Sequence, residues 1–259
     1  MNIIVCIKQV PDTTDIKINP EHNTLIREGV ESIINPFDTY ALEEALLLKE
    51  AHGGTVTVIS MGPPQVESAL REALAIGADN AILISDRKFA GSDTLATSYT
   101  LSAAIRKIGD YDIILFGKQA IDGDTAQVGP GVARNLDIPQ IAFVKNIDSL
   151  ENGTIVAHRM MEDGFDVVES QLPIVLTVVK DINEPRLPSL RTKMKAKKAE
   201  IPVWTFDDLH LEETKVGLNG SPTWVEKVFT PTMEKKTMML EGEPEEVAEK
   251  LAEYLKELC

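Results

Sequence analysis

The first 135 residues alternate short apolar runs with longer stretches of helical periodicity, and this alternation constrains the fold most. The apolar runs, rich in β-branched residues as buried strands are, cover residues 2–8, 55–60, 80–85 and 111–117. The helical stretches cover residues 37–52, 65–77, 93–109 and about 126–135. Strand–helix alternation of this kind predicts parallel βαβ units and an α/β fold with a doubly wound, mostly parallel sheet.

The hydrophobic period changes from about Pro139. Three strand-like stretches follow at 141–150, 153–161 and 165–172, and Asp163-Gly164 predicts a tight hairpin turn between the last two. We expect these antiparallel hairpins, about 139–171, to be added to the parallel sheet. A further apolar strand at 172–179 completes a nucleotide-binding α/β domain of residues 1–180, and 16–28 predicts a small surface hairpin.

Regular patterning fades after Lys180. Residues 181–240 contain prolines and little periodicity, and they are too many for a passive loop, so they are either disordered or wrapped over something else. The final stretch, 243–258, is an amphipathic helix with apolar Val247, Leu251, Tyr254, Leu255 and Leu258. We therefore expect residues 181–259 to form an extended docking arm whose terminal helix contacts a partner subunit.

Charge and hydropathy exclude several classes of protein. The 259 residues include 26 Lys and Arg against 41 Asp and Glu, a net charge of −15, which argues against a nucleic-acid surface. The sequence has no apolar run of 18 residues, which predicts no membrane insertion, and its start lacks the pattern of a signal peptide. We expect a soluble, cytoplasmic protein.

Catalytic side chains are scarce. The four histidines are scattered, no metal-binding or nucleophile motif occurs, and Cys6 and Cys259 lie at opposite ends of the chain. Cys6 falls in a predicted buried strand, where a packed, unreactive thiol is expected. A chain of this kind would hold a cofactor that carries the chemistry, with no metal site and no catalytic side chain.

Ligands of open parallel sheets bind beyond the carboxyl ends of the strands, where strand order reverses. Four segments fall at such ends: 6–12, 60–65, 85–98 and 117–131. The last combines glycines with Asp122, Asp124, Thr125 and Gln127 before a helix, a composition that suits a diphosphate and a ribose. An ordinary capped turn explains the same residues equally well.

For two other segments the residues alone favour a structural role. In 85–98, Ser92 or Asp93 can cap a helix whose first turn carries Thr94, Thr97 and Ser98 as solvated hydroxyls. Asn35 precedes Pro36 at a helix start, where capping is the default and a ligand contact is the alternative.

A basic segment stands out in this acidic chain. Residues 186–198 contain six Lys and Arg and no acidic residue, and Leu187 and Leu190 lie among them. Charge that steers an encounter and an apolar side chain that anchors it would suit partner docking. A solvated loop, or an internal partner for acidic residues, is the alternative.

Six motifs occur in the order and spacing of one known family. They are KQVPDT (8–13), SIINPFDTYALEEAL (32–46), MGPPQ (61–65), ALAIGAD (73–79), GKQAIDGDTAQVGP (117–130) and NEPRLPSL followed by MKAKK (183–198). Over essentially the whole chain they resemble the β (small) subunit of electron-transfer flavoproteins. The resemblance implies a Rossmann-like sheet of the adenine-nucleotide-binding type and a heterodimer with a larger α subunit that carries FAD.

Three segments resemble the branch that binds a second FAD in place of a structural AMP: DGDTAQVGP (122–130), SDRKFAGSDTLATS (85–98) and GLNGSPTWVEKVF (217–229). By this resemblance the cofactor-binding residues are Cys6, Asn35, Met61, Gly62, Thr94, Thr97, Asp122, Gly123, Asp124, Thr125, Gln127, Val128, Ser221 and Thr223. Thr94 and Thr97 would lie near the flavin, and Ser221 and Thr223 would approach it from the arm.

The resemblance also implies a function. The second FAD would accept a hydride from NADH and split the electrons between a low-potential acceptor, ferredoxin or flavodoxin, and the α-subunit FAD. That FAD would pass them to an acyl-CoA-dehydrogenase-like or related flavin dehydrogenase, which would dock on Leu187, Leu190 and Met194. A β subunit with structural AMP, acting as scaffold and docking module, is the alternative, and without the resemblance a nucleotide-binding sensor is a third.

Overall fold

The computed structural model describes residues 1–12, 18–19, 24–25, 32–226 and 239–258. The main sheet contains β1 (Asn2–Cys6), β6 (Thr55–Met61), β7 (Asn80–Ile84), β8 (Ile113–Gly117), β9 (Gln140–Glu151), β10 (Thr154–Met160), β11 (Phe165–Gln171), β12 (Ile174–Val178) and β13 (Val203–Trp204). The helices are α1 (Pro36–His52), α2 (Glu67–Ile76), α3 (Thr94–Ile108), α4 (Val128–Leu136), α5 (Leu190–Lys198) and α6 (Pro244–Leu258). Two small antiparallel pairs join β2 (Gln9–Pro11) to β5 (Ser32–Ile34) and β3 (Ile18–Asn19) to β4 (Thr24–Leu25).

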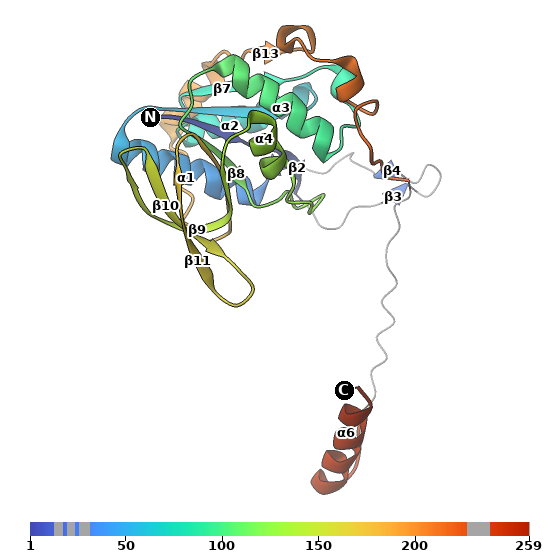
Figure 1. Cartoon of the computed structure of the whole chain (residues 1–259). Coiled ribbons are helices and arrows are strands. Elements are labelled where there is room, and N and C mark those ends of the chain that lie inside the picture. The colour runs from blue at the N-terminus through green and yellow to red at the C-terminus, as the bar shows by residue number, and fades with distance from the viewer. Residues whose placement is uncertain (13–17, 20–23, 26–31, 227–238, 259) are drawn as a thin grey trace.

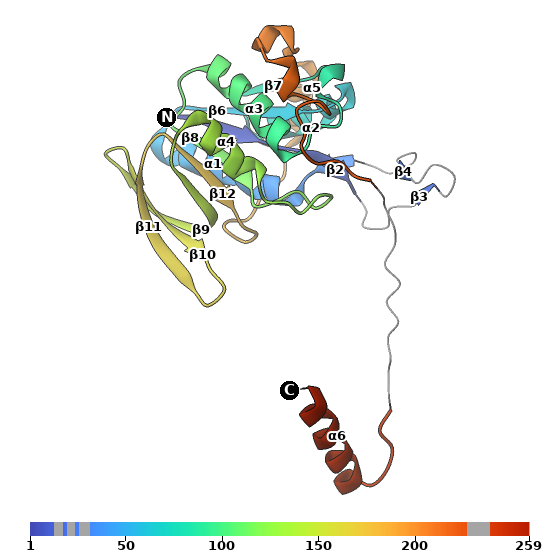
Figure 2. The ribbon, with the colours of Figure 1, turned by 45° about the vertical axis from the view of Figure 1, so that its right-hand side comes forward.

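The strand order of the sheet is β11-β10-β9-β12-β8-β1-β6-β7-β13 (Figure 1). The strands from β9 to β13 in this order run parallel, and β10 and β11 continue the sheet antiparallel, as predicted. Figure 2 shows β9, β10 and β11 as a curved extension of the sheet. The chain places β6 and β7 on one side of β1 and then β8 on the other, so strand order reverses between β1 and β8.

Strand β1 shows why both faces of the sheet are covered. Ile3 and Val5 point into a core shared with α1 and α2, whereas Ile4 and Cys6 point into a second core shared with α3 and α4. Side chains of a strand alternate between its faces, so a continuously apolar run buries both. The sequence-based prediction of a strand buried on both faces is confirmed.

The prediction of little regular structure after Lys180 is wrong for residues 190–204, which form α5 and β13. Helix α5 begins where Ser189 Oγ accepts the N–H of Thr192, and it ends where Arg71 of α2 donates to the main-chain oxygens of Ala196, Lys197 and Ala199. The last carbonyl oxygens of a helix lack the full set of partners within the helix; Ala196 O also accepts the N–H of Ala199, and Arg71 supplies a donor to all three oxygens. The helix therefore depends on a residue distant in sequence, which local periodicity does not reveal.

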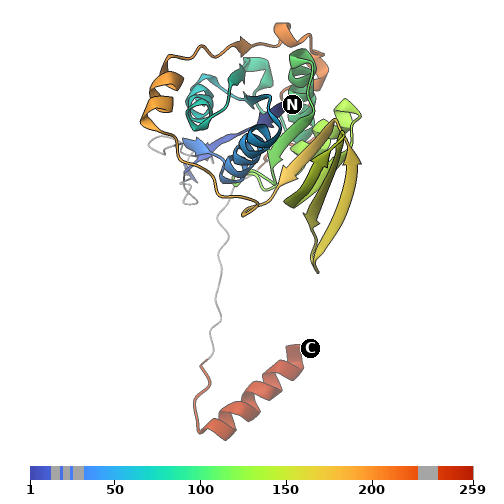
Figure 3. The ribbon, with the colours of Figure 1, turned by 90° about the vertical axis from the view of Figure 1, so that its left-hand side faces the viewer.

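The arm is also fastened to α1. Arg186 donates to Glu43 at 2.8–3.1 Å and to Glu50 at 2.5 Å, and Asn183 donates to Glu44 at 2.8 Å. The hydrogen bonds to Glu43 and Glu50 raise the pKa of the Arg186 guanidinium. Figure 3 shows the arm, in orange, running around the outside of the α/β body. Up to Thr223, which bonds to Asp93, the arm therefore packs against its own chain.

Helix α6 forms as predicted and leaves Leu251, Tyr254 and Leu255 exposed. In the described part of the chain, no helix is both long and apolar enough to cross a membrane.

A close approach between β8 and the start of α1 yields a test of the fold. A Cβ at Gly117 would lie 2.5 Å from Asp38 Oδ1 and 2.5 Å from the main-chain carbonyl carbon of Phe37, so we expect Gly117→Ala to lower the free energy of unfolding by about 1–3 kcal/mol. A Cβ at Gly123 would meet no atom within 4 Å, and Gly123→Ala is the matched control, expected within about 0.5 kcal/mol of the parent. Urea unfolding measures both, and equal stabilities would contradict the close approach.

Candidate functional site

The candidate site lies where strand order reverses. Strands β1 and β8 are parallel neighbours, so their carboxyl ends, and the loops that follow them, meet at one edge of the sheet. Residues 117–127 connect β8 to α4 across this edge. Two of the predicted loops, 6–12 and 117–131, are therefore adjacent.

Asn35 joins the β8–α4 loop to the start of α1. It is fully buried, its Nδ2 donates to the main-chain oxygen of Gln119 at 2.8 Å, and its Oδ1 accepts the N–H of Ile121 at 3.1 Å. The predicted capping role is wrong, because its side chain makes no cap hydrogen bond to α1. A buried amide needs both a donor and an acceptor, and the loop backbone supplies them.

Lys8 and Asp122 form an ion pair across the same edge. Lys8 Nζ lies 2.6 and 2.7 Å from the two carboxylate oxygens of Asp122. The sequence analysis assigned a ligand role to Asp122 and none to Lys8, since residues 114 positions apart give no local signal of pairing. This pair holds the β8–α4 loop to the turn after β1.

The β8–α4 loop is open to solvent beyond these attachments. Asp122, Gly123, Asp124, Thr125 and Gln127 are exposed, and nothing would contact a Cβ at Gly123. Asp124 has a left-handed backbone (φ 48°), a conformation that L residues rarely adopt, and its side chain accepts from Gln119 Nε2 at 2.6 Å. The exposed backbone next to the start of α4 can receive a phosphate-bearing ligand.

Close packing joins this loop to α3. The buried hydroxyl of Ser98 donates to Thr94 O at 2.6 Å and lies 3.2 Å from Val128 O, and a Cβ at Gly131 would meet Ser98 Oγ at 2.3 Å. Glycine at 131 therefore lets the first turns of the two helices touch. The half-buried Thr94 and Thr97 belong to this first turn of α3, which therefore lies beside the start of α4.

The arm returns to this place at residues 221–223. Asp93 caps α3, as one of the two predicted capping residues, by accepting the N–H groups of Leu95 and Ala96. Ser221 Oγ accepts the N–H of Asp93 at 2.8 Å, and Thr223 Oγ1 donates to Asp93 Oδ2 at 2.8 Å. The structure thus brings the predicted residues Thr94, Ser221 and Thr223 together.

Asp93 is ionised in this arrangement. Partial burial acts to raise the pKa of Asp93, but the N–H groups of Ala96, Thr223 and Leu95 and the hydroxyl of Thr223 outweigh it and hold the pKa below its usual value.

Cys6 and the turn after β6 complete the predicted set. Cys6 is buried, and burial first, with the nearby Asp38 second, raises the pKa of its thiol well above the usual range. The predicted burial of Cys6 is confirmed. Met61 and Gly62 are half-buried, and the N–H of Gly62 donates to Ile84 O at 3.0 Å.

Asp38 is a buried carboxylate that the sequence analysis missed. Its Oδ2 accepts the N–H of Lys8 at 2.7 Å and its Oδ1 accepts the N–H of Gly117 at 3.1 Å, so it joins the carboxyl ends of β1 and β8 to α1. Burial raises the pKa of Asp38 to about 7 although these N–H groups act to lower it. In the sequence, an acidic residue in the first turn of a helix is explained by the helix dipole alone. Nothing local therefore indicates that Asp38 binds the ends of β1 and β8.

The predicted docking residues lie on the outer side of the arm. Leu187 is 91% exposed, Leu190, the first residue of α5, is 83% exposed, and Met194 is 68% exposed. In the basic segment Arg186 is an internal partner of acidic residues, whereas the five remaining basic side chains are exposed. Arg186 is therefore the internal partner of acidic residues that was considered for this segment, and the other five basic residues are solvated.

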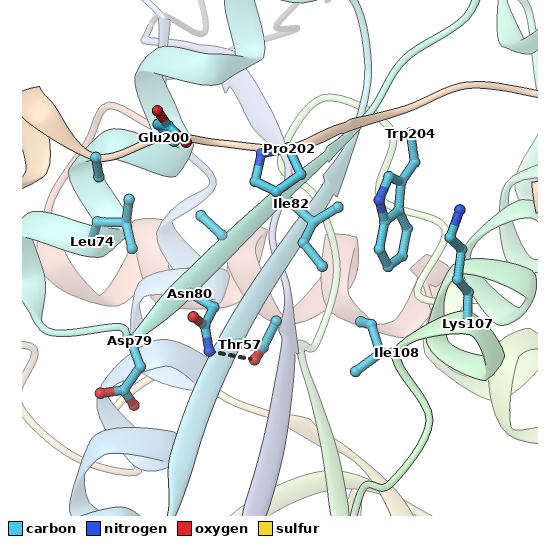
Figure 4. A pocket seen from close by; sticks show the side chains of 12 residues that line it. Thr57, Leu74, Asp79, Asn80, Ile82, Lys107, Ile108, Glu200, Pro202 and Trp204 are labelled. Atoms are coloured by element: carbon cyan, nitrogen blue, oxygen red, sulfur yellow. Dashed lines mark hydrogen bonds between the residues drawn. The ribbon is translucent and has the colours of Figure 1, made fainter. Parts of the chain in front are cut away.

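A cavity of about 430 Å³ lies elsewhere, at the amino end of β7 beneath the arm (Figure 4). Ile82, Ile108, Asn80 and Trp204 help to line it, and Lys107 Nζ lies 4.7 Å from the centre of the Trp204 ring. No residue predicted to bind a cofactor lines this cavity. In the described residues no group of three or more His, Cys, Asp or Glu side chains is placed to hold a metal ion.

The chain is similar to proteins of one known family. Residues 22–209 match the family model described as "Electron transfer flavoprotein domain". The chain is 51% identical over 256 residues to an electron transfer flavoprotein subunit beta of Thermoanaerobacterium thermosaccharolyticum, covering 98% of each chain, and 50% identical to that of Megasphaera elsdenii, covering 94% and 92%. It is 49% identical to the caffeyl-CoA reductase-Etf complex subunit CarD of Acetobacterium woodii, covering 99% and 98%.

The raised pKa of Asp38 predicts a pH dependence of stability. A carboxyl group with a pKa of 3.8 when unfolded and about 7 when folded binds its proton more tightly in the folded protein, so the stability it contributes at low pH is lost as pH rises toward 7. We expect the wild type to lose roughly 2–3 kcal/mol of stability between pH 5 and pH 8 relative to Asp38→Asn, measured by urea unfolding. Parallel pH profiles for the two proteins would show that Asp38 titrates normally.

Proposed function

The chain belongs to the electron transfer flavoprotein family, as a β subunit, and we propose that it binds a second FAD that takes electrons from NADH. In this proposal the heterodimer with an α subunit divides those electrons between a low-potential acceptor, ferredoxin or flavodoxin, and the α-subunit FAD. That FAD serves an acyl-CoA-dehydrogenase-like or related flavin dehydrogenase. The relative CarD is named for a complex with a reductase, which supports a partner of this kind.

One observation carries the choice of FAD over AMP. The β8–α4 loop, at 122–128, suffices for an adenosine phosphate, but a second set of hydroxyls lies next to it on Thr94, Thr97, Ser221 and Thr223. Ser98 joins the two sets by bonding to both first turns. A mononucleotide bound at the first set would not extend to the second, whereas a dinucleotide extends across both.

Different residues would bind the diphosphate and the flavin ring of the FAD. N–H groups at the start of α4 would meet the diphosphate. Asn35 and the Lys8–Asp122 pair hold the preceding loop in place. The second set of hydroxyls would orient the flavin ring. When bound, the flavin would supply hydride acceptance and one-electron transfer, which need stacking and exclusion of water more than a protein nucleophile.

Two surfaces would serve the partners. The exposed apolar stripe of α6, with Leu251, Tyr254 and Leu255, would contact the α subunit, and Leu187, Leu190 and Met194 would contact the dehydrogenase. Both surfaces belong to the 181–259 segment, which we propose as the docking part of a chain whose residues 1–180 hold the nucleotide.

The cofactor content of the purified heterodimer tests the proposal. We expect two FAD and negligible AMP per heterodimer when the nucleotides are released and quantified by chromatography. One FAD with one AMP would assign this chain a scaffolding and docking role without NADH chemistry.

The docking role of Leu190 can be tested separately. We expect Leu190→Ala to slow electron transfer to the dehydrogenase about tenfold while leaving flavin reduction by NADH unchanged, because the side chain is 83% exposed and is not among the residues proposed to bind FAD. Leu47→Ala, at an exposed leucine of α1, is the matched control and should change neither rate. If both steps slow together in Leu190→Ala, the residue is structural.

A further inference from the structure

Asp93 gives each of its carboxylate oxygens a separate task. Oδ1 accepts the N–H groups of Leu95 and Ala96, at 2.9 and 3.1 Å, and so caps α3. Oδ2 accepts both the N–H and the hydroxyl of Thr223, at 3.2 and 2.8 Å, although Thr223 lies 130 positions later. The main-chain N–H of Asp93 adds a third tie by donating to Ser221 Oγ. One residue therefore caps a helix and clamps the arm.

The clamp fixes the hydrogen-bonding polarity of the arm hydroxyls. An ionised carboxylate only accepts, so Thr223 Oγ1 must donate its proton to Asp93 and keeps only lone pairs for a ligand. Ser221 Oγ donates to Gly217 O at 2.7 Å and accepts from Asp93, so its proton is also engaged within the protein. Both hydroxyls can thus act only as acceptors toward a third group.

We propose that Asp93 is a positioning residue for the second FAD: it holds Ser221 and Thr223 so that their lone pairs face the imide N–H of the flavin ring, the one N–H that the oxidised ring carries. This inference rests on the proposed function. Both carboxylate oxygens of Asp93 accept hydrogen bonds from the protein, so Asp93 would affect the flavin only by positioning Ser221 and Thr223 of the arm. The charge-assisted bond from Thr223 makes the clamp stronger than one between neutral groups.

The variant Asp93→Asn separates the two tasks. Its amide oxygen can still accept from Leu95 and Ala96, since Asn is a good cap, but its NH₂ group cannot accept from Thr223. We expect the dissociation constant of the second FAD to rise about tenfold or more, measured by titrating deflavinated heterodimer with FAD. Amide hydrogen exchange of residues 217–223 should become faster, which reports release of the arm without reference to activity.

Asp86 provides a matched control on the same β7–α3 connection. Its Oδ1 caps a short turn by accepting from Lys88, and its Oδ2 accepts the N–H of Phe206 in the arm, at 3.0 and 3.1 Å. Asp86→Asn therefore makes the same chemical change at another arm contact, and we expect it to keep wild-type FAD affinity. At the clamp itself, Thr223→Val removes the hydroxyl and should weaken FAD binding. Thr223→Ser keeps the hydroxyl and should bind FAD as the wild type does.

The outcomes separate this inference from the proposed function. Two FAD in the wild type with undiminished affinity in both Asp93→Asn and Thr223→Val would overturn the clamp and leave the proposed function standing. Equal weakening in Asp86→Asn would also overturn it, because any arm contact would then suffice. One FAD and one AMP in the wild type would overturn the proposed function and the role of Asp93 with it.

Discussion

A single buried carboxylate holds together the edge of the sheet on which the candidate site depends. Asp38 accepts one N–H from the turn after β1 and one from the end of β8, and it does so from the first turn of α1. Strand order reverses between these two strands, so loops of different origin meet here. Without this acceptor, the buried N–H of Gly117 would be unpaired, at a cost of about 1–3 kcal/mol, and the partly buried N–H of Lys8 would lose its partner as well.

The loops on this edge are held by residues that leave their outer surface free. Asn35, at the start of α1, and Lys8, after β1, bind the β8–α4 loop, while Gly123 and its neighbours remain exposed. Glycine at 131 and the hydroxyl of Ser98 then join α4 to α3, which places a second set of hydroxyls beside the first loop. A rigid support with an open face is the arrangement expected of a ligand site.

The arm shows how an acidic chain uses a basic segment. Arg186 neutralises Glu43 and Glu50, and Arg71 of α2 binds the end of α5, so the segment is fastened at both ends. The exposed lysines and Leu190 between these attachments are therefore presented on a fixed helix. Docking from a preformed helix costs less ordering entropy than docking from a mobile loop.

The sequence by itself determined the α/β class, the family, the loops proposed for the site, and the helices and main-sheet strands up to residue 178. It did not reveal the β2–β5 pair. Apolar periodicity encodes burial within a few residues, and the family motifs are local strings, so both can be read along the chain. Only the tertiary structure decided that Asn35 binds a loop and does not cap, that Lys8 pairs with Asp122, that Asp38 is buried, and that Asp93 clamps Thr223. Each of these contacts joins residues 30 to 130 positions apart, and their geometry arises only when the sheet is assembled.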